Sequence, residues 1–280
     1  MVRKAVIPVA GLGTRFLPIT KALPKEMLPI VDKPNLQYIV DEAIESGITE
    51  ILIVANHDKL AIEKYFTEDV ALEKALEEKG KIELLKLLKE TNYDVTIDFA
   101  FEDMALGNGM AIKMAKDFVN GEPFALMYGD DLMKYDVPVL KQLIDVHEEF
   151  GCNVVAALEV DENEVCNYGI MKLKEGTNII ESFVEKPEIG KAPSNYAGVG
   201  RYILNPEVFD ELDKLEISPN GEYQFTLTFE PLMKYQEMRA CPFKGKYYNI
   251  GSKLGYLKAN VDFALEREDL LEFKTFISEK

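Results

Sequence analysis

Two glycines and a series of cations near the N-terminus form the segment best suited to binding an anion. Residues 10–15 (AGLGTR) follow a strand-like run and precede a helical pattern. Glycine lets backbone N–H groups approach an anion closely, and Arg15, Lys21 and Lys25 add positive charge that suits phosphate oxygens. The segment has neither the third glycine of a dinucleotide fingerprint nor the Gly-Lys-Ser/Thr of a P-loop. It indicates a phosphate-binding loop of another kind, with a plain tight turn as the alternative.

An acidic pair, Asp130 and Asp131, stands directly after a strand-like run at residues 123–128 (PFALMY). Ligands of open α/β sheets bind beyond the carboxyl ends of the strands, and Mg²⁺ prefers one or two carboxylates together with phosphate oxygens and water. Asp130 is therefore a candidate magnesium ligand, with a turn-capping aspartate as the alternative. We expect Asp131 to support the structure instead.

Side chains for nucleophilic catalysis or for a zinc site are scarce. The chain has two histidines, and its three cysteines, Cys152, Cys166 and Cys241, lack metal-type spacing. We expect reduced thiols and a cytoplasmic protein. The N-terminus enters a strand-like segment directly and no apolar run approaches 18 residues, so neither a signal peptide nor a membrane span is expected.

The charge balance restricts the partners. The 32 Lys and Arg residues against 49 Asp and Glu residues give a net charge of −17 over 280 residues. Such a surface repels nucleic-acid phosphates and anionic lipid, so no nucleic-acid or membrane partner is expected. An anionic substrate would need a pocket that concentrates positive charge.

The first half of the chain alternates short β-rich runs with helical patterns. This alternation predicts an α/β fold whose mostly parallel central sheet has helices on both faces. The expected strands are 5–9, 50–55, 94–101 and 123–128, and the expected helices are 36–44, one that follows Asn108, and 137–150.

After Cys152 the pattern changes to four strand-like runs, which predict a small additional β region on the same body. These runs cover residues 153–160, 168–173, 179–185 and 198–204. A long helical pattern extends from Lys253 to about Phe273. The charged stretch 68–90 is an amphipathic helix broken near Gly80, either a solvated surface excursion or a partner-binding arm. No linker or repeat divides the chain, so we expect one compact unit.

Residues 10–43 (AGLGTRFLPITKALPKEMLPIVDKPNLQYIVDEA) resemble the motif of bacterial UTP–glucose-1-phosphate uridylyltransferases, within the sugar-nucleotide pyrophosphorylase superfamily. The resemblance continues in the same order over essentially the whole chain. Its further motifs are residues 129–131 (GDD), 168–170 (YGI), 184–187 (VEKP), 192–195 (APSN), 200–202 (GRY) and 251–256 (GSKLGY).

This resemblance implies a Rossmann-like nucleotidyltransferase fold and a Mg²⁺-dependent transfer of a uridylyl group from UTP to glucose 1-phosphate. It also implies a homodimer or homotetramer. The single domain 1–280 would comprise a nucleotide-binding core (1–150), a sugar-binding part (151–250) and a helical tail (251–280). The attacking phosphate is already ionised at neutral pH, so this chemistry needs alignment and charge neutralisation but no general base.

The resemblance also assigns roles to individual residues. The catalytic residues would be Arg15, Lys25 and Lys186; the nucleotide-binding residues Ala10, Gly11, Leu12, Gly13, Thr14, Glu102 and Gly107; the sugar-binding residues Gly169, Glu185 and Asn195; and the metal ligands Asp130 and Asn249.

Four positions depart from the family pattern. Glu102 replaces a glutamine that reads the uracil edge, Met110 a histidine, Leu227 an aspartate, and Asn249 the second metal-binding aspartate. An ionised glutamate cannot donate a hydrogen bond, and an amide is a weaker ligand than a carboxylate for a hard dication. Two alternatives therefore stay open: a nucleotidyltransferase with altered nucleotide or sugar preference, or a catalytically weak regulatory paralogue.

Overall fold

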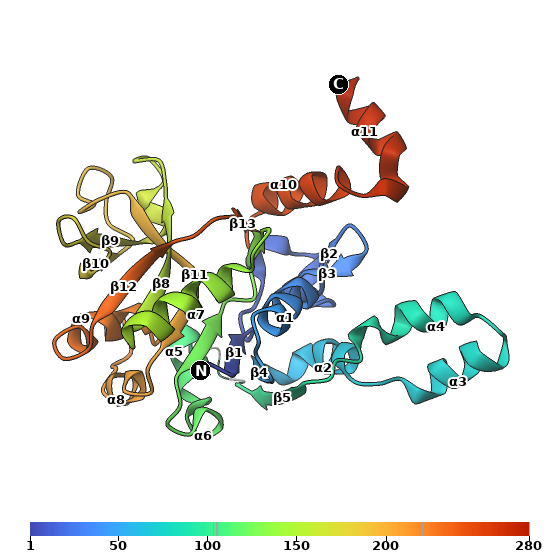
Figure 1. Cartoon of the computed structure of the whole chain (residues 1–280), viewed down its shortest axis with the longest axis horizontal. Coiled ribbons are helices and arrows are strands. Elements are labelled where there is room, and N and C mark those ends of the chain that lie inside the picture. Colours follow the sequence, from blue (N-terminus) through green and yellow to red (C-terminus); the bar gives the residue numbers. More distant parts are fainter. Residues whose placement is uncertain (103, 105, 220, 280) are drawn as a thin grey trace.

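A nine-stranded sheet forms the centre of the protein in the computed structural model, which describes residues 1–102, 104, 106–219 and 221–279 (Figure 1). The strands are β1 Lys4–Pro8, β2 Pro29–Ile30, β3 Lys33–Pro34, β4 Glu50–Ala55, β5 Thr96–Phe101, β6 Phe124–Met127, β7 Asp131–Lys134, β8 Asn153–Glu159, β9 Gly169–Leu173, β10 Ile180–Glu185, β11 Tyr196–Leu204, β12 Met238–Pro242 and β13 Lys246–Asn249. The α-helices are α1 Asn35–Glu45, α2 Leu60–Phe66, α3 Val70–Glu78, α4 Ile82–Leu88, α5 Asn108–Lys113, α6 Lys116–Val119, α7 Val139–Phe150, α8 Val208–Leu212, α9 Phe229–Leu232, α10 Lys253–Ala264 and α11 Leu271–Ser278.

The four strands of the first half are parallel neighbours, in the order β6-β1-β4-β5. Their side chains alternate between the two faces of the sheet. Ile7 belongs to the core on the side of α1 and α7, whereas its neighbour Val6 belongs to the core on the side of α5, α8 and α9. Both faces are buried, which explains why these strands are continuous apolar runs. The predicted α/β fold class is confirmed.

The later strands extend this same sheet. Strand β11 pairs antiparallel with β6 through Arg201–Leu204, and with β9 through Tyr196–Gly198. Its other edge pairs with β8, which in turn pairs with β12. Two small antiparallel sheets, β13-β7 and β2-β3, lie apart from it. The long strand β11 thus joins the two halves of the chain in one continuous layer.

The predicted long tail helix is wrong, because it divides into α10 and α11. Arg267, between them, has an extended backbone (φ −74°, ψ 126°). Its guanidinium binds the carboxylate of Asp32 at 2.8 and 2.9 Å and that of Asp269 at 2.7 and 2.8 Å. The interruption between α10 and α11 therefore coincides with a contact between Arg267 and the distant residue Asp32. The helical periodicity of the tail sequence does not predict this contact.

The charged stretch 68–90 forms a helical hairpin of α3 and α4 that projects from the body, as does α11 (Figure 1). The turn at Gly80 has φ +63°, which glycine adopts without strain. No α-helix within the described ranges is long and apolar enough to cross a bilayer.

Candidate active site

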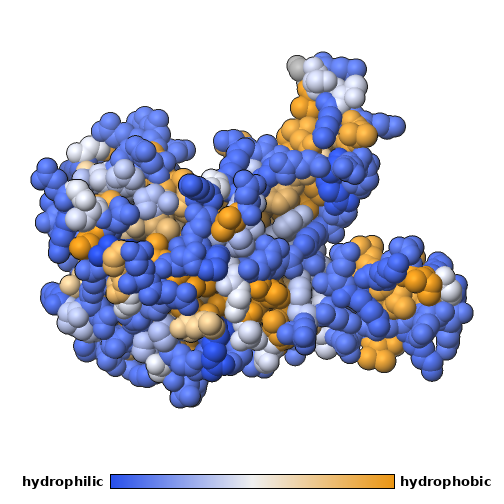
Figure 2. Space-filling view, in the orientation of Figure 1, coloured by the Kyte–Doolittle hydropathy of each residue, from blue (hydrophilic) through white to orange (hydrophobic). Residues whose placement is uncertain are grey.

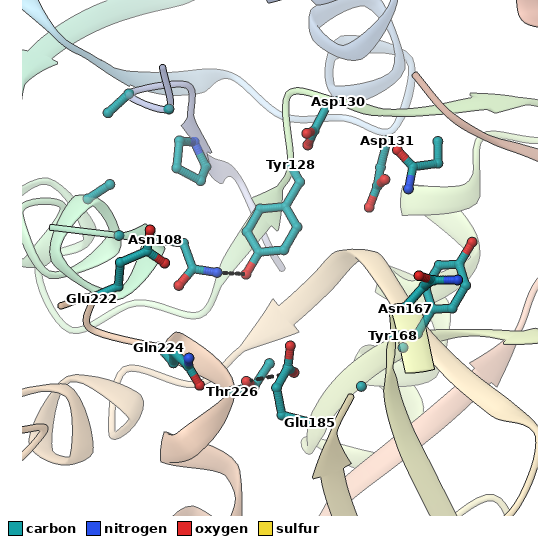
Figure 3. A pocket seen from close by; sticks show the side chains of 18 of the residues that line it. Asn108, Tyr128, Asp130, Asp131, Asn167, Tyr168, Glu185, Glu222, Gln224 and Thr226 are labelled. Atoms are coloured by element: carbon teal, nitrogen blue, oxygen red, sulfur yellow. Dashed lines mark hydrogen bonds between the residues drawn. The ribbon is translucent and has the colours of Figure 1, made fainter. Parts of the chain in front are cut away.

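A cavity of about 670 Å³ opens beyond the carboxyl ends of the parallel strands (Figure 3). The loop after β1 provides one wall, Glu102 follows β5, and Asp130 follows β6. The opposite wall comes from β9, β10 and the 3-10 helix η7 at Phe225–Thr228, which contribute Gly169, Glu185 and Thr226. This volume lies in the range of small-molecule sites.

The glycine loop keeps its backbone open towards the cavity. Gly11 has no atom within 4 Å of where a Cβ would lie. Gly13 has φ +66°, and a Cβ there would lie 3.3 Å from both Lys25 Cβ and Thr20 Cγ2. The Thr20 hydroxyl donates to the carbonyl of Gly13 at 2.9 Å, and Arg15 donates to the carbonyl of Gly251 at 3.4 Å. The loop therefore combines exposed backbone with two cations at its margin.

Lys25 and Asp130 form an ion pair in the cavity wall, with 2.6 Å between Nζ and Oδ2. Burial acts against the charge on Lys25, but Asp130 and Glu26 outweigh it and raise the pKa of Lys25. Burial likewise acts against the charge on Asp130, but Lys25 outweighs it and lowers the pKa of Asp130. Both groups are therefore charged at neutral pH.

Asp131 uses both carboxylate oxygens in hydrogen bonds to the protein, as expected of a residue that supports the structure. It accepts from the backbone N–H of Gly200 at 2.8 Å and from the Tyr247 hydroxyl at 2.7 Å. Burial and the negative charge of Asp130 raise the pKa of Asp131 to about 6. Asp131 thus joins β11 and β13 beneath Asp130.

Two oxygen ligands face the same space beside Gly251. A Cβ at Gly251 would lie 2.8 Å from Asp130 Oδ2 and 3.1 Å from Asn249 Oδ1, so only glycine leaves this space open. No cluster of three or more His, Cys, Asp or Glu side chains that could hold a metal occurs in the described part of the chain. The residues present therefore fit a dication as a partial set, one carboxylate and one amide oxygen, with phosphate oxygens and water as the remaining ligands.

Glu185 and Lys186 lie at the opposite wall. Glu185 Oε2 accepts from the Thr226 hydroxyl at 2.9 Å, and a Cβ on Gly169 would approach Phe183 to 2.3 Å (Figure 3). Lys186 has φ +45°, which is uncommon for a residue with a side chain. Its backbone N–H donates to the carbonyl of Tyr168 at 3.0 Å, and its Nζ lies 3.5 Å from Glu185. Such backbone strain clusters at functional sites.

Glu102 is buried at the end of the cavity that follows β5. Its backbone N–H donates to the carbonyl of Ala55 at 2.7 Å, and its Oε1 accepts from the N–H of Met104 at 2.8 Å. Gly107 packs against Glu222, where a Cβ would lie 2.8 Å from the Cβ of that residue. At this end of the cavity, the Glu102 carboxylate therefore lies in a wall that also contains the closely packed backbone of Gly107.

Almost all the residues selected from the sequence line this one cavity, but Lys21 and Asn195 do not. Asn195 is held elsewhere. Its Nδ2 donates to Glu159 Oε1 at 3.0 Å outside the lining. Met110 and Leu227, two of the departures from the family pattern, are also absent from the lining within the described residues. The polar lining residues to which the sequence analysis gave no role are Asn108, Tyr128, Asn167, Tyr168, Tyr202, Glu222, Gln224, Thr226 and Tyr247. Tyr168 and Tyr202 lie inside the motifs 168–170 and 200–202, and Tyr128 and Asn167 directly precede motifs, which is the signal that could have found them.

The cavity is not positively charged as a whole, although the pocket of an anionic substrate is expected to concentrate positive charge. The described lining holds the cations Arg15, Lys25 and Lys186 against five carboxylates, those of Glu102, Asp130, Asp131, Glu185 and Glu222. The cations lie at the two walls, so positive charge is placed locally and does not dominate the whole cavity. Backbone N–H groups and a dication would have to complete the neutralisation of an anionic ligand.

A glycine loop at the carboxyl edge of a parallel sheet, facing a second wall on antiparallel strands, defines a nucleotide-binding transferase of the α/β class. A family model described as nucleotidyl transferase matches residues 4–266, so the chain belongs to the nucleotidyl transferase family.

The curated relatives agree with this family assignment. The chain is 44% identical over 282 residues to the UTP–glucose-1-phosphate uridylyltransferase of Staphylococcus epidermidis, covering 99% of this chain and 98% of that one. It is 48% identical over 273 residues to UTP–glucose-1-phosphate uridylyltransferase 2 of Streptococcus pyogenes, covering 95% and 91%. The resemblance seen in the sequence is confirmed.

Solved structures share the whole architecture. A UTP-bound UDP-glucose pyrophosphorylase from Acinetobacter baumannii is 36% identical with a TM-score of 0.92, covering 100% of this chain and 99% of that one. A UDP-glucose pyrophosphorylase complexed with UDP-glucose is 39% identical with a TM-score of 0.85, covering 95% and 100%.

Proposed function

We propose that this chain transfers a uridylyl group from UTP to glucose 1-phosphate, with UDP-glucose and pyrophosphate as products. The observation that carries the proposal is the single cavity that joins the glycine loop, Lys25 and Asp130 on one wall to Glu185 and Lys186 on the other. The names of the relatives, and the similar structures that are bound to UTP and complexed with UDP-glucose, support this choice of substrates.

The proposed chemistry is an in-line displacement. A phosphate oxygen of the sugar phosphate attacks the α-phosphorus of UTP, and the bond from that phosphorus to the oxygen bridging to the β-phosphate breaks, which releases pyrophosphate. The backbone of residues 10–14 and the Arg15 side chain would hold the triphosphate, and Lys25 would face the reacting phosphate. Lys186 would bind the sugar phosphate, and Glu185 and Gly169 would shape the sugar site. Glu102 and Gly107 would face the base.

We propose Mg²⁺ as the cofactor, held by Asp130 and Asn249 beside Gly251. A bound dication would neutralise charge on the triphosphate. The pair provides one formal negative charge, so we expect affinity in the millimolar range or weaker in the absence of substrate phosphates.

One assay tests the proposal directly. Purified protein is incubated with each of UTP, dTTP, CTP and GTP, with several sugar 1-phosphates and with Mg²⁺, and pyrophosphate release is measured. The proposal requires release with UTP and glucose 1-phosphate, and requires that Asp130→Ala abolish it. If no combination of nucleotide and sugar 1-phosphate releases pyrophosphate, the hypothesis that remains is a catalytically weak regulatory paralogue.

An altered base preference is the second candidate, favoured by the buried carboxylate of Glu102. Uracil offers two carbonyl acceptors and one N–H, so glutamate can accept from the N–H but offers no donor to a carbonyl. Higher kcat/KM for a nucleotide other than UTP in the same assay would support this candidate over the first.

We further propose that the protein is a cytoplasmic homo-oligomer. Its three cysteines are unpaired thiols, which a reducing compartment maintains. The α3–α4 hairpin exposes Leu72, Leu84 and Leu87, and Figure 2 shows apolar surface on this projection. A second copy of the chain would cover it. Light scattering of the parent and of Leu84→Glu/Leu87→Glu tests the assembly: a smaller mass for the variant supports it, and a monomeric parent refutes it.

A further inference from the structure

A row of alternating charges leads from the interior of the protein to the candidate active site. Lys59 Nζ lies 2.8 Å from Glu26 Oε2, Glu26 Oε1 lies 3.9 Å from Lys25 Nζ, and Lys25 Nζ lies 2.6 Å from Asp130 Oδ2. The Lys59 and Glu26 side chains are buried, with exposed fractions of 8% and 1%, whereas those of Lys25 and Asp130 are 19% and 33% exposed. Only Lys25 and Asp130 line the cavity.

Tight packing fixes the buried end of the row. Lys59 also donates to the carbonyl of Val9, at the end of β1. A Cβ on Gly129 would lie 2.6 Å from the Val9 side chain and 3.3 Å from Glu26 Cγ, so glycine is needed where the chain after β6 passes Val9 and Glu26. The row thus connects the segments that follow three adjacent strands, β4, β1 and β6.

Each buried charge depends on its partner. Burial raises the pKa of Glu26, and the charges of Lys59 and Lys25 oppose that rise. Burial lowers the pKa of Lys59, and Glu26 opposes that fall. A buried carboxylate without a cation would be strongly unfavourable, so Lys59 is what allows Glu26 to present a negative charge to Lys25.

The position of Lys25 between two carboxylates bears on its proposed role. An ammonium group has three N–H donors. If Asp130 were its sole anionic partner, a dication on Asp130 would leave Lys25 without a fixed position. Glu26, outside the cavity lining, gives Lys25 a second ionic partner at 3.9 Å, which persists when Asp130 and the substrate phosphates change their contacts.

We propose that Glu26 and Lys59 are positioning residues, which hold the Lys25 ammonium at the reacting phosphate independently of Asp130. This inference rests on the proposed function and deepens it, because it extends the catalytic machinery to two buried residues that do not touch substrate. It also assigns a role to Lys59, which no sequence motif singled out.

Three variants test the row. Lys59→Met removes the cation and keeps the length of the side chain, Glu26→Gln removes the anion and keeps its shape, and the double variant removes both charges. Lys4→Met is the matched control, because Lys4 is also buried, with Glu122 at 2.7 Å and two backbone carbonyls as partners, and lies outside the cavity lining.

The double variant separates positioning from structural support. We expect Lys59→Met to lower both the melting temperature and kcat, because the buried Glu26 loses its nearer cation and keeps only Lys25 at 3.9 Å. In the double variant the melting temperature should recover, while kcat stays about 10- to 100-fold below the parent, with KM for UTP changed by less than about threefold. Lys4→Met should lower only the melting temperature. Recovery of kcat together with stability in the double variant would overturn the proposal, as would an equal loss of kcat in Lys4→Met.

A second measurement does not depend on turnover. In ¹⁵N NMR, a Lys25 ammonium held by two carboxylates should give slowly exchanging Nζ–H signals, assigned by their disappearance in Lys25→Arg. The signals should be present in the parent and lost in the double variant, and their persistence in the double variant would refute the row. A parent that shows these signals but no turnover would contradict the proposed function and leave the row supported.

Discussion

The metal site gives the sharpest prediction, through the substitution Asn249→Asp. The oxygens of Asn249 and Asp130 both lie about 3 Å from the position that a Gly251 Cβ would take. A carboxylate at residue 249 would therefore lie within about 6 Å of the Asp130 carboxylate. Without a cation the two negative charges repel each other. A bound dication attracts both carboxylates and offsets that repulsion.

The magnitude follows from this geometry. At 6 Å and an effective dielectric constant of about 20, two unit charges repel by about 3 kcal/mol. The Asp130 side chain is one-third exposed and is paired with Lys25, so we reduce this value to about 1–2 kcal/mol. The metal-free variant should therefore melt roughly 2–8 °C below the parent. Binding of Mg²⁺ should relieve the same repulsion and lower the apparent Kd about 5- to 30-fold.

Two assays check the predicted loss of stability without metal and the predicted gain in Mg²⁺ affinity. Melting temperatures are measured with EDTA and with increasing Mg²⁺, and pyrophosphate release is titrated with Mg²⁺. Asn167→Asp is the matched control, since it adds one charge to the same lining outside the pair beside Gly251. We expect Mg²⁺ to restore the stability of Asn249→Asp and to raise its rate. A melting temperature that Mg²⁺ does not restore, together with unchanged Mg²⁺ dependence, would show that residue 249 does not face the metal.

Three further predictions concern other parts of the chain. Lys186→Ala should slow turnover about 10- to 100-fold, a moderate loss because its side chain is 62% exposed, and unchanged turnover would remove it from the site. Glu102→Gln should favour UTP by about 1–3 kcal/mol, read from kcat/KM for four nucleotides, and identical ratios would mean that residue 102 does not contact the base. Cys152 and Cys241 are buried, and burial raises the pKa of each thiol to about 11, so iodoacetamide at pH 7.5 should modify only Cys166 in the native protein, as measured by mass spectrometry. Labelling of either buried cysteine before unfolding would contradict that burial.

The sequence by itself determined the central layer and the ligand-facing loops. Apolar runs such as residues 50–55 have strand length and composition, and the helical repeat of residues 36–44 ends before Gly47, so local periodicity was enough to place β4 and α1. The glycine loop and the acidic residue after β6 were visible as motifs, because their chemistry depends on neighbours in the chain.

Tertiary structure alone decided which distant residues meet. Asp130, Asn249 and Gly251 converge because β13 pairs antiparallel with β7, which places Asn249 opposite Asp131, next to Asp130. Lys59 reaches Glu26 because β4 lies beside β1 in the sheet. Asn195 belongs to a matching motif yet bonds to Glu159 outside the cavity. Periodicity and motif spacing report contacts between near neighbours, whereas these arrangements depend on strand order and on the packing of loops more than 30 residues apart.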